Sequence, residues 1–317
     1  MIIKLFGDRR RRAYGLVTAT ALATAVTGCS TSTPAQNTNS SSGSNTKIAV
    51  VAAENFWGSV ATQLGGVHAT VTSIISNPAA DPHSYEPTPA DGRTIASAQY
   101  AIVNGIGYDP WAPKLISANP NDKRTVLMVG ELVGVPTGGN PHRWYSPDDV
   151  HKVIEQITAD YKKIDPADAA YFDTQKQTFE TQGLGQYTKL ISDIKSKYAA
   201  TPIGASESIV TPLAAGLGLK MLTPDTFLNA ISEGSDPTAA DKTTVDAQIK
   251  GKQIKVYVYN SQNSTPDVQA QVDAAKAAGI PVTTVTETLI PAEATFQDWQ
   301  TKQLQGIEQA LAQATGK

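Results

Sequence analysis

The chain has 317 residues, of which 40% are apolar, so it is long enough for one large or two medium domains with hydrophobic cores. Its formal net charge of −3 does not provide the basic surface that nucleic-acid binding requires, and that class of function is excluded. The single cysteine rules out an internal disulfide. We therefore expect a globular protein whose partner is not a nucleic acid.

The first 28 residues are typical of a lipoprotein signal peptide. An arginine-rich start precedes an uncharged run of small and apolar residues, Ala13–Thr27. At about 15 residues this run is shorter than the roughly 20 that a transmembrane helix needs, so we expect cleavage. The run ends in VTGC, which resembles a bacterial lipobox, although leucine is usual where Val26 stands and alanine or serine where Thr27 stands. A twin-arginine signal is the less favoured reading of the arginines.

The lipobox predicts that Cys29 carries a lipid and becomes the first residue of the mature protein. Residues 29–46 are rich in Ser, Thr, Asn and Gly, a composition that cannot bury a core and that behaves as a flexible tether. More than one acyl chain gives stable membrane anchoring. We therefore expect the protein at the cell membrane, lipid-anchored on the extracytoplasmic face.

Residues 47–165 alternate short apolar runs with helical stretches and are predicted to form an N-terminal α/β lobe. The predicted buried strands are residues 47–53, 69–75, 99–105 and 125–130. Strands that alternate with helices favour a mostly parallel sheet with helices on both faces, in which ligands bind at the carboxyl ends of strands.

A long helix over residues 166–200 then interrupts the alternation, and a second α/β lobe follows over 201–317. Apolar residues at helical spacing mark the helix, which opens at Asp165-Pro166. Gly183 and Gly185 weaken it by roughly 1 kcal/mol each, so a kink near residue 184 is an alternative to one continuous helix. The second lobe has predicted strands at 202–206, 217–222, 255–260 and 280–286, and an amphipathic helix after Phe296 closes the chain.

Four polar residues follow predicted strands in a way that suggests a site for a divalent metal. Two of the four histidines, His83 in DPHSYEPTPAD and His142 in NPHRWYSPDDV, stand after prolines in polar loops behind the second and fourth strands. Glu207 and Glu287 come directly after two strands of the second lobe. Neutral imidazoles with carboxylate oxygens make a charge-neutralising set of ligands for a dication.

These phrases, with ASES and VTETLIP, resemble the cluster A-I metal-binding lipoproteins, which are the solute-binding components of bacterial ABC importers for manganese and zinc. The resemblance covers nearly all of the mature chain. It implies two α/β lobes joined by one long rigid helix, with one metal ion between the lobes. It also implies that His83, His142, Glu207 and Glu287 are the ligands, and that an ABC permease with its ATPase subunit is the partner of a monomeric protein.

The same resemblance favours Mn²⁺ over Zn²⁺. The third ligand is histidine in many zinc-binding members and glutamate in manganese-type members, and here it is Glu207. Zinc-specialised members carry a His-rich loop, yet this chain has no histidine between His83 and His142. Glu287 departs from the aspartate that is frequent at the fourth position, so it is the least secure of the four.

Asp81, Glu86, Trp144 and Tyr145 are candidates to support the ligands from behind, because metal-bound histidines need an orienting acceptor. The remaining histidines, His68 and His151, are interpreted as structural or exposed.

Capture and delivery of a metal is the function predicted from these residues, and we expect no enzyme activity. Four protein ligands leave little room for the water or substrate that a catalytic metal keeps. The alternatives are a metal-dependent hydrolase, for which the sequence shows no HExxH-like helix or Ser-His-Asp order, and a surface adhesin or binder of a metal chelate on the same fold.

Overall fold

The structure, a computed structural model, describes residues 47–317. The predicted signal peptide, the lipidation site Cys29 and the tether up to residue 46 lie outside the described residues. Among residues 47–317, no helix combines the length and the apolar character that crossing a bilayer requires.

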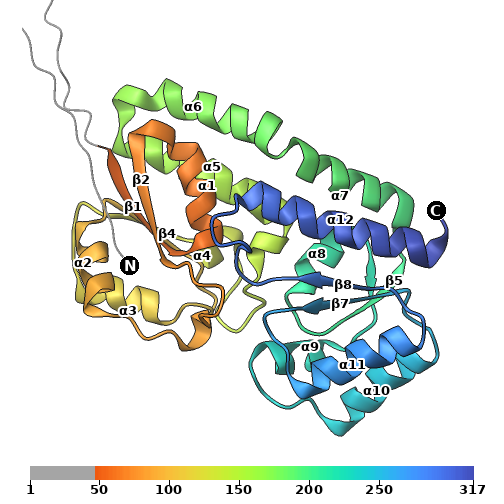
Figure 1. The fold of residues 1–317 in the computed structure, drawn as a ribbon. Helices are drawn as coiled ribbons and strands as arrows, with labels where there is room; N and C mark the ends of the chain where they lie inside the picture. The colour runs from red at the N-terminus through yellow and green to blue at the C-terminus, as the bar shows by residue number, and fades with distance from the viewer. Residues whose placement is uncertain (1–46) are drawn as a thin grey trace, which may run out of the picture. The chain divides into compact units, whose positions relative to one another are not determined.

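The first half of the described chain forms a sheet of four parallel strands in the order β2-β1-β3-β4. The strands are β1 (Ile48–Glu54), β2 (Ala69–Ile75), β3 (Tyr100–Val103) and β4 (Thr125–Met128). The helices of this lobe are α1 (Asn55–Gly65), α2 (Pro89–Ser97), α3 (Trp111–Ala118), α4 (Val129–Val133) and α5 (Pro147–Ile164). Alternate residues of β1 face opposite ways, so that Val50 joins the core under α1 and α5 while Val51 packs against Ile95 of α2. Helices therefore cover both faces of the sheet (Figure 1).

The second half repeats this layout with the strand order β6-β5-β7-β8. Its strands are β5 (Pro202–Ala205), β6 (Lys220–Met221), β7 (Val256–Asn260) and β8 (Val282–Val285). Its helices are α8 (Val210–Gly216), α9 (Asp225–Ser232), α10 (Ala239–Lys250), α11 (Pro266–Ala277) and α12 (Phe296–Thr315). The predicted fold class, two lobes with parallel sheets flanked by helices, is confirmed. Predicted and observed strands overlap in every case, although β6 is much shorter than predicted and the run at 125–130 turns into α4 after Met128.

The connection between the lobes is not the single α-helix that we predicted. Two α-helices, α6 (Ala169–Thr178) and α7 (Gly185–Tyr198), are joined by a π-helical turn over Phe179–Gly183. The amide of Leu184 donates to the carbonyl of Phe179, five residues earlier, at 2.7 Å. A side chain at position 183 would come within 2.8 Å of the Phe179 ring, which explains the glycine. The two helices still run along one side of both lobes, with α12 beside α7 (Figure 1).

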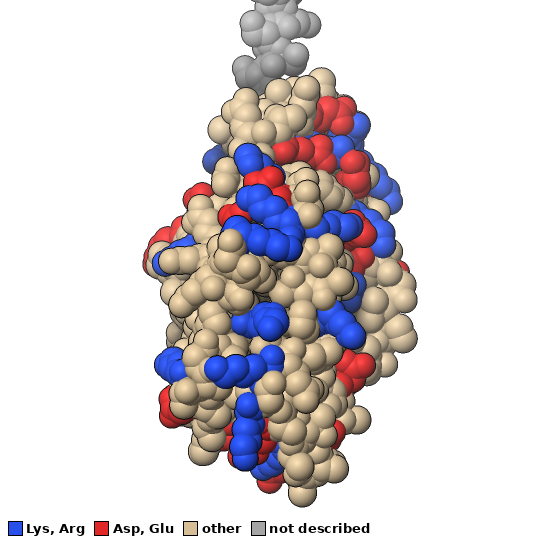
Figure 2. Space-filling model, turned by 90° about the vertical axis from the view of Figure 1, so that its right-hand side faces the viewer, with Lys and Arg blue, Asp and Glu red and all other residues tan. Residues whose placement is uncertain are grey.

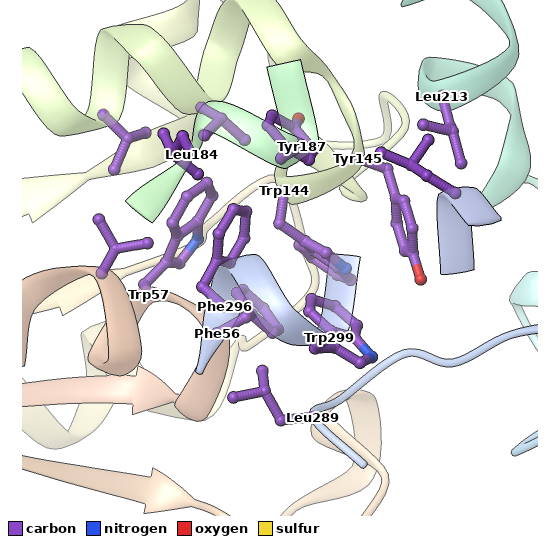
Figure 3. Packing of buried hydrophobic residues seen from close by; sticks show 14 of the residues in the cluster. Phe56, Trp57, Trp144, Tyr145, Leu184, Tyr187, Leu213, Leu289, Phe296 and Trp299 are labelled. Atoms are coloured by element: carbon purple, nitrogen blue, oxygen red, sulfur yellow. The ribbon is translucent and has the colours of Figure 1, made fainter. Parts of the chain in front are cut away.

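An aromatic core lies between the two lobes and the connecting helices (Figure 3). Phe56 of α1 stacks on Trp144 with ring centroids 4.0 Å apart, and Trp57 stacks on Phe296 of α12 at 6.4 Å. Tyr145 and Trp299 continue the cluster at 5.7 Å. Because residues of both lobes are buried in one core, large separation of the lobes would expose this aromatic surface and is disfavoured.

The surface shows no large field of one charge on the face in Figure 2, where basic side chains form separate groups divided by uncharged surface. This distribution agrees with the modest net charge of −3.

Candidate metal centre

The four candidate ligands lie around one cavity. Glu207 and Glu287 each stand two residues beyond a strand, β5 and β8, whereas His83 lies in the longer loop after β2 and His142 in the loop after α4. His83 and His142 from the first lobe and Glu207 and Glu287 from the second all line a cavity of about 520 Å³. The strand ends at which Glu207 and Glu287 were sought therefore lie at the same cavity as the histidines of the two Pro-His phrases.

His83 lies in a short 3₁₀ turn, Pro82–Ser84, between β2 and α2. Asp81 precedes the turn and accepts a hydrogen bond from the backbone N–H of His83 at 2.9 Å, which fixes the start of the turn. The ring of Tyr108 meets the imidazole edge to face, with centroids 4.9 Å apart. The Nε2 atom of His83 is buried and has no hydrogen-bond partner within residues 47–317. A buried nitrogen without a partner is costly, and a metal ion in the cavity would satisfy it.

His142 is almost fully buried, with 1% of its surface exposed. Its Nδ1 lies 3.0 Å from Oδ1 of Asn140, and its Nε2 lies 3.6 Å from Oε1 of Glu287. The asparagine oxygen can only accept, so Nδ1 carries the proton and Nε2 is left free as a ligand atom. Burial lowers the pKa of His142, despite the opposing effect of Glu287. The neutral imidazole that a metal needs is therefore the favoured form.

Glu207 stands two residues beyond β5 and is held by two amides of the second lobe. Asn263 donates to its Oε2 at 2.8 Å, and Asn260, the last residue of β7, donates to its Oε1. Burial, followed by the charge of Glu287, raises the pKa of Glu207 to about 8. The carboxyl group is thus largely protonated at neutral pH until a cation enters the cavity.

Glu287 follows β8, and its backbone is fixed by Gln262. The Gln262 Oε1 accepts hydrogen bonds from the backbone N–H groups of Glu287 and Thr288. Behind this segment, the hydroxyl of Tyr145 donates to the carbonyl of Thr286 at 2.7 Å. The Glu287 side chain remains partly exposed to the cavity and lies next to His142.

Two carboxylates and two neutral imidazoles would give the set of four candidate ligands a charge of −2 when both carboxyl groups are ionised, which a divalent ion neutralises. The donor set of two nitrogens and two oxygens suits first-row divalent metals. Without an ion, burial and the charge of Glu287 make the ionisation of Glu207 costly, as its raised pKa shows. The residues present therefore fit a divalent cation as the ligand of this site.

The predicted supporting residues have different positions. Asp81 lines the cavity, Trp144 contacts the His142 ring with centroids 5.2 Å apart, and Tyr145 supports the segment before Glu287. Glu86 is exposed and does not line the cavity, so the structure does not bring it to the site. The 3₁₀ turn at residues 82–84 fixes the direction of the following loop, which explains why nearness in sequence to His83 was misleading.

Several supporting residues were missed in the sequence. They are Asn140, Asn260, Gln262 and Asn263, which hold the ligands as described above. Asn260 could have been found, because it is the last residue of a predicted strand of the second lobe, and Glu207 and Glu287 were sought at such strand ends. The others lie in loops, and nothing in their local pattern indicates which group they contact.

A buried acidic pair behind the first-lobe ligands was also missed. Glu54, the last residue of β1, is fully buried, and burial with the nearby Asp109 raises its pKa well above the ordinary value. Asp109 accepts from the backbone N–H groups of Asn104 and Gly105, each at 2.8 Å. The Asn104 side chain in turn donates to the carbonyl of Pro141 at 3.0 Å, next to His142. This network ties the loop after β3 to the loop that carries His142.

The chain is similar to known metal-binding proteins. Residues 50–310 match the family described as ZnuA, zinc-uptake complex component A, periplasmic. The manganese-binding lipoprotein MntA of Halalkalibacterium halodurans is 28% identical over 46% of this chain and 49% of that relative, so this match spans about half of the relative's length. The manganese-binding lipoprotein MntA of Bacillus subtilis is 24% identical over 85% of this chain and 87% of its own.

A solved structure shows the same fold. The Mn-bound periplasmic metal-binding protein from Candidatus Liberibacter asiaticus superposes with a TM-score of 0.70 at 20% sequence identity, over 84% of this chain and 100% of that chain. The family match covers most of the described residues, from within β1 to within α12. The chain therefore belongs to the ZnuA family of metal-binding solute-binding proteins, the cluster A-I group that its His83 and His142 phrases resemble.

Proposed function

We propose that this protein captures one divalent transition-metal ion outside the cytoplasm and delivers it to an ABC importer. Its partners are then a permease and the ATPase subunit of that permease, and Cys29 is the lipid anchor that holds the protein at the membrane. The observation that supports this proposal best is the convergence of His83, His142, Glu207 and Glu287, two from each lobe, on one cavity.

Capture is a better account of this site than catalysis. Four side-chain ligands, two of them carboxylates that can bind through one or both oxygens, occupy most positions around a divalent ion, whereas a catalytic metal keeps a position open for water or substrate. The family to which the chain belongs consists of transport binding proteins, and no relative reported above is named as an enzyme. The predicted absence of enzyme activity agrees with this family, and nothing supports the hydrolase alternative.

Mn²⁺ is the ion that we favour, with Zn²⁺ next. Carboxylate oxygens suit Mn²⁺, and two of the four proposed ligands are glutamates. Two relatives are named as manganese-binding, and the matched solved structure contains Mn. Zn²⁺ binds most nitrogen and oxygen sites more tightly than Mn²⁺, so the ion that is carried in the cell depends on which one is available.

Hydrogen bonds between the lobes join the loops that carry the proposed ligands. Because these bonds hold the ligands in place, breaking them would release the ion with only a small movement. Gln262, which holds the Glu287 backbone, also donates from Nε2 to the carbonyl of Pro78 in the His83 loop at 2.8 Å. Asn140, which orients His142, donates to the carbonyl of Ser208, next to Glu207, at 2.7 Å. A partner that breaks these bonds would pull ligands away from the ion without opening the shared aromatic core.

The proposal is tested by counting metal ions bound to purified protein after dialysis against Mn²⁺. We expect about one ion per chain, which is lost in His83→Ala and in His142→Ala. His151→Ala is the matched control, because His151 is about half exposed on α5 and does not line the cavity. Retention of the ion in both ligand variants, or no tight Mn²⁺ or Zn²⁺ binding by the wild type, would overturn the proposal.

A further inference from the structure

We propose a second metal site, for Zn²⁺, at His68, Asp165 and Asp168. This site belongs to the outer end of the first lobe and does not share a residue with the cavity between the lobes. One ligand atom from each of the three residues lies within 4.8 Å of the other two. The proposal goes beyond the proposed transport function and does not depend on it.

Two segments that are distant in sequence supply the ligands. His68 ends the 3₁₀ turn η1 (Gly66–His68), immediately before β2. Asp165 follows α5, and Asp168 ends the 3₁₀ turn η4 (Pro166–Asp168), where α6 begins. The Nδ1 atom of His68 lies 2.7 Å from Oδ2 of Asp168. An ion here would therefore connect the first lobe to the start of the helices that lead to the second lobe.

The two carboxylates are not used in the ways that are usual at helix ends. Neither Asp165 nor Asp168 caps the helical turn that follows it. Among residues 47–317, the Asp165 carboxylate has no side-chain hydrogen bond or ion pair, and that of Asp168 has only His68. Both carboxylates are partly buried, and within residues 47–317 the His68 imidazole pairs with that of Asp168 only, so the Asp165 carboxylate is left to take a cation.

The surrounding backbone adds to the attraction for a cation. Asp165 is the residue at the C-terminal end of the 18-residue helix α5. The last carbonyl groups of a helix give this end a partial negative charge, which favours a cation within the last turn. The carboxylates and the helix end therefore act in the same direction.

His68 is held in place for this role. The ring of Tyr171 lies against it with centroids 4.4 Å apart, and Phe172 meets it edge to face at 5.9 Å. The Tyr171 hydroxyl accepts a hydrogen bond from the backbone N–H of Val67 at 3.0 Å, which fixes the turn that carries His68. A ligand whose orientation is already fixed loses little conformational entropy when the metal binds.

The chemistry is a simple ligand exchange. Zn²⁺ takes imidazole nitrogen and carboxylate oxygen in tetrahedral sites, and its bonds of about 2.0–2.1 Å keep neighbouring ligand atoms roughly 3.3 Å apart. The His68–Asp168 pair must open slightly from 2.7 Å to admit the ion. Nδ1 of His68 must carry no proton to bind the ion, so an imidazolium releases that proton to solvent and a neutral ring moves it to Nε2. Zn²⁺ gives up bound waters, and one water remains as the fourth ligand. Oxidation states do not change.

The experiment counts Zn²⁺ ions per chain by native mass spectrometry after zinc loading. We expect two ions in the wild type, one in His83→Ala, one in His68→Ala and none in the double variant, while His151→Ala keeps two. Asp165→Asn leaves the His68–Asp168 pair intact, so its loss of one ion would not come from misfolding. Melting curves without zinc check that each variant is folded.

The experiment can contradict either proposed site without contradicting the other. One ion in the wild type that persists in His68→Ala and Asp165→Asn but is lost in His83→Ala would overturn the second site alone. One ion that persists in His83→Ala but is lost in His68→Ala would support the second site and contradict the proposed transport site. Titration with Co²⁺ in the His83→Ala background gives an independent readout, because a tetrahedral nitrogen and oxygen site produces intense visible absorption and a solvated ion does not.

Discussion

Metal capture by the central cavity should release protons, because Glu207 is protonated before the ion binds. Burial and the charge of Glu287 raise the pKa of Glu207 to about 8, whereas burial lowers the pKa of His142. Only the carboxylate form of Glu207 coordinates a metal. The empty protein therefore holds a proton that the loaded protein lacks, so affinity falls as the pH drops below about 8.

The size of this effect follows from the pKa. With one group that titrates near pH 8 in the empty protein only, lowering the pH from 8 to 6.5 weakens binding about 15-fold, or about 1.6 kcal/mol. The number of protons released per ion rises over the same range, from about one half at pH 8 to nearly one at pH 6.5. Burial lowers the pKa of His142, which reduces the share of this proton release that comes from its imidazole.

Isothermal titration calorimetry with Mn²⁺ in buffers of different ionisation enthalpy measures both quantities. Glu233→Gln is a suitable control, because Glu233 lines the same cavity but is not a proposed ligand, and it should keep the proton release. The Glu207→Gln variant should bind Mn²⁺ weakly and without releasing a proton. Affinity that does not change between pH 8 and 6.5, with no proton release, would refute the electrostatic account of the site.

Three further predictions concern residues around the ligands. Asn140→Ala removes the acceptor that orients His142 and should weaken Mn²⁺ binding by about 10–100-fold in equilibrium titration; unchanged affinity would show that the ring is held by packing alone. Gln262→Ala removes hydrogen bonds to the loop of His83 and to the loop of Glu287. It should speed the release of the metal to a chelator in stopped-flow experiments. A release rate equal to that of the wild type would contradict the proposed role of Gln262. Trp144→Ala removes a fully buried ring from the core between the lobes. It should lower the free energy of unfolding, measured by denaturant titration, by about 3–5 kcal/mol. A loss below about 1 kcal/mol would argue against a shared core.

The placement of the ligands was predictable because one physical rule governs it. Parallel strands end at the same edge of a sheet, so polar residues just after predicted strands are brought together whatever the details of the loops. Glu207 and Glu287 were selected in this way, whereas His83 and His142 were first singled out by their Pro-His phrases, and all four line one cavity. The roles of these four residues as ligands remain a prediction.

Features that depend on contacts between distant segments could not be predicted. The π-helical turn depends on how Phe179 packs over Gly183, and the glycines alone predicted only a weak point in a helix. Asn140 and Gln262 each donate a hydrogen bond to a backbone carbonyl of the other lobe. Their local sequence does not reveal these partners. The apolar run at 125–130 has no periodicity that separates a strand from the start of α4.

The central claim is that side chains from both lobes bind one ion together. Anomalous diffraction at the manganese absorption edge, from crystals of the Mn²⁺-loaded protein, tests it most directly. The account predicts that the strongest peak lies within bonding distance of His83, His142, Glu207 and Glu287 at once. A strongest peak outside the cavity, or one bonded to the residues of a single lobe, would contradict it.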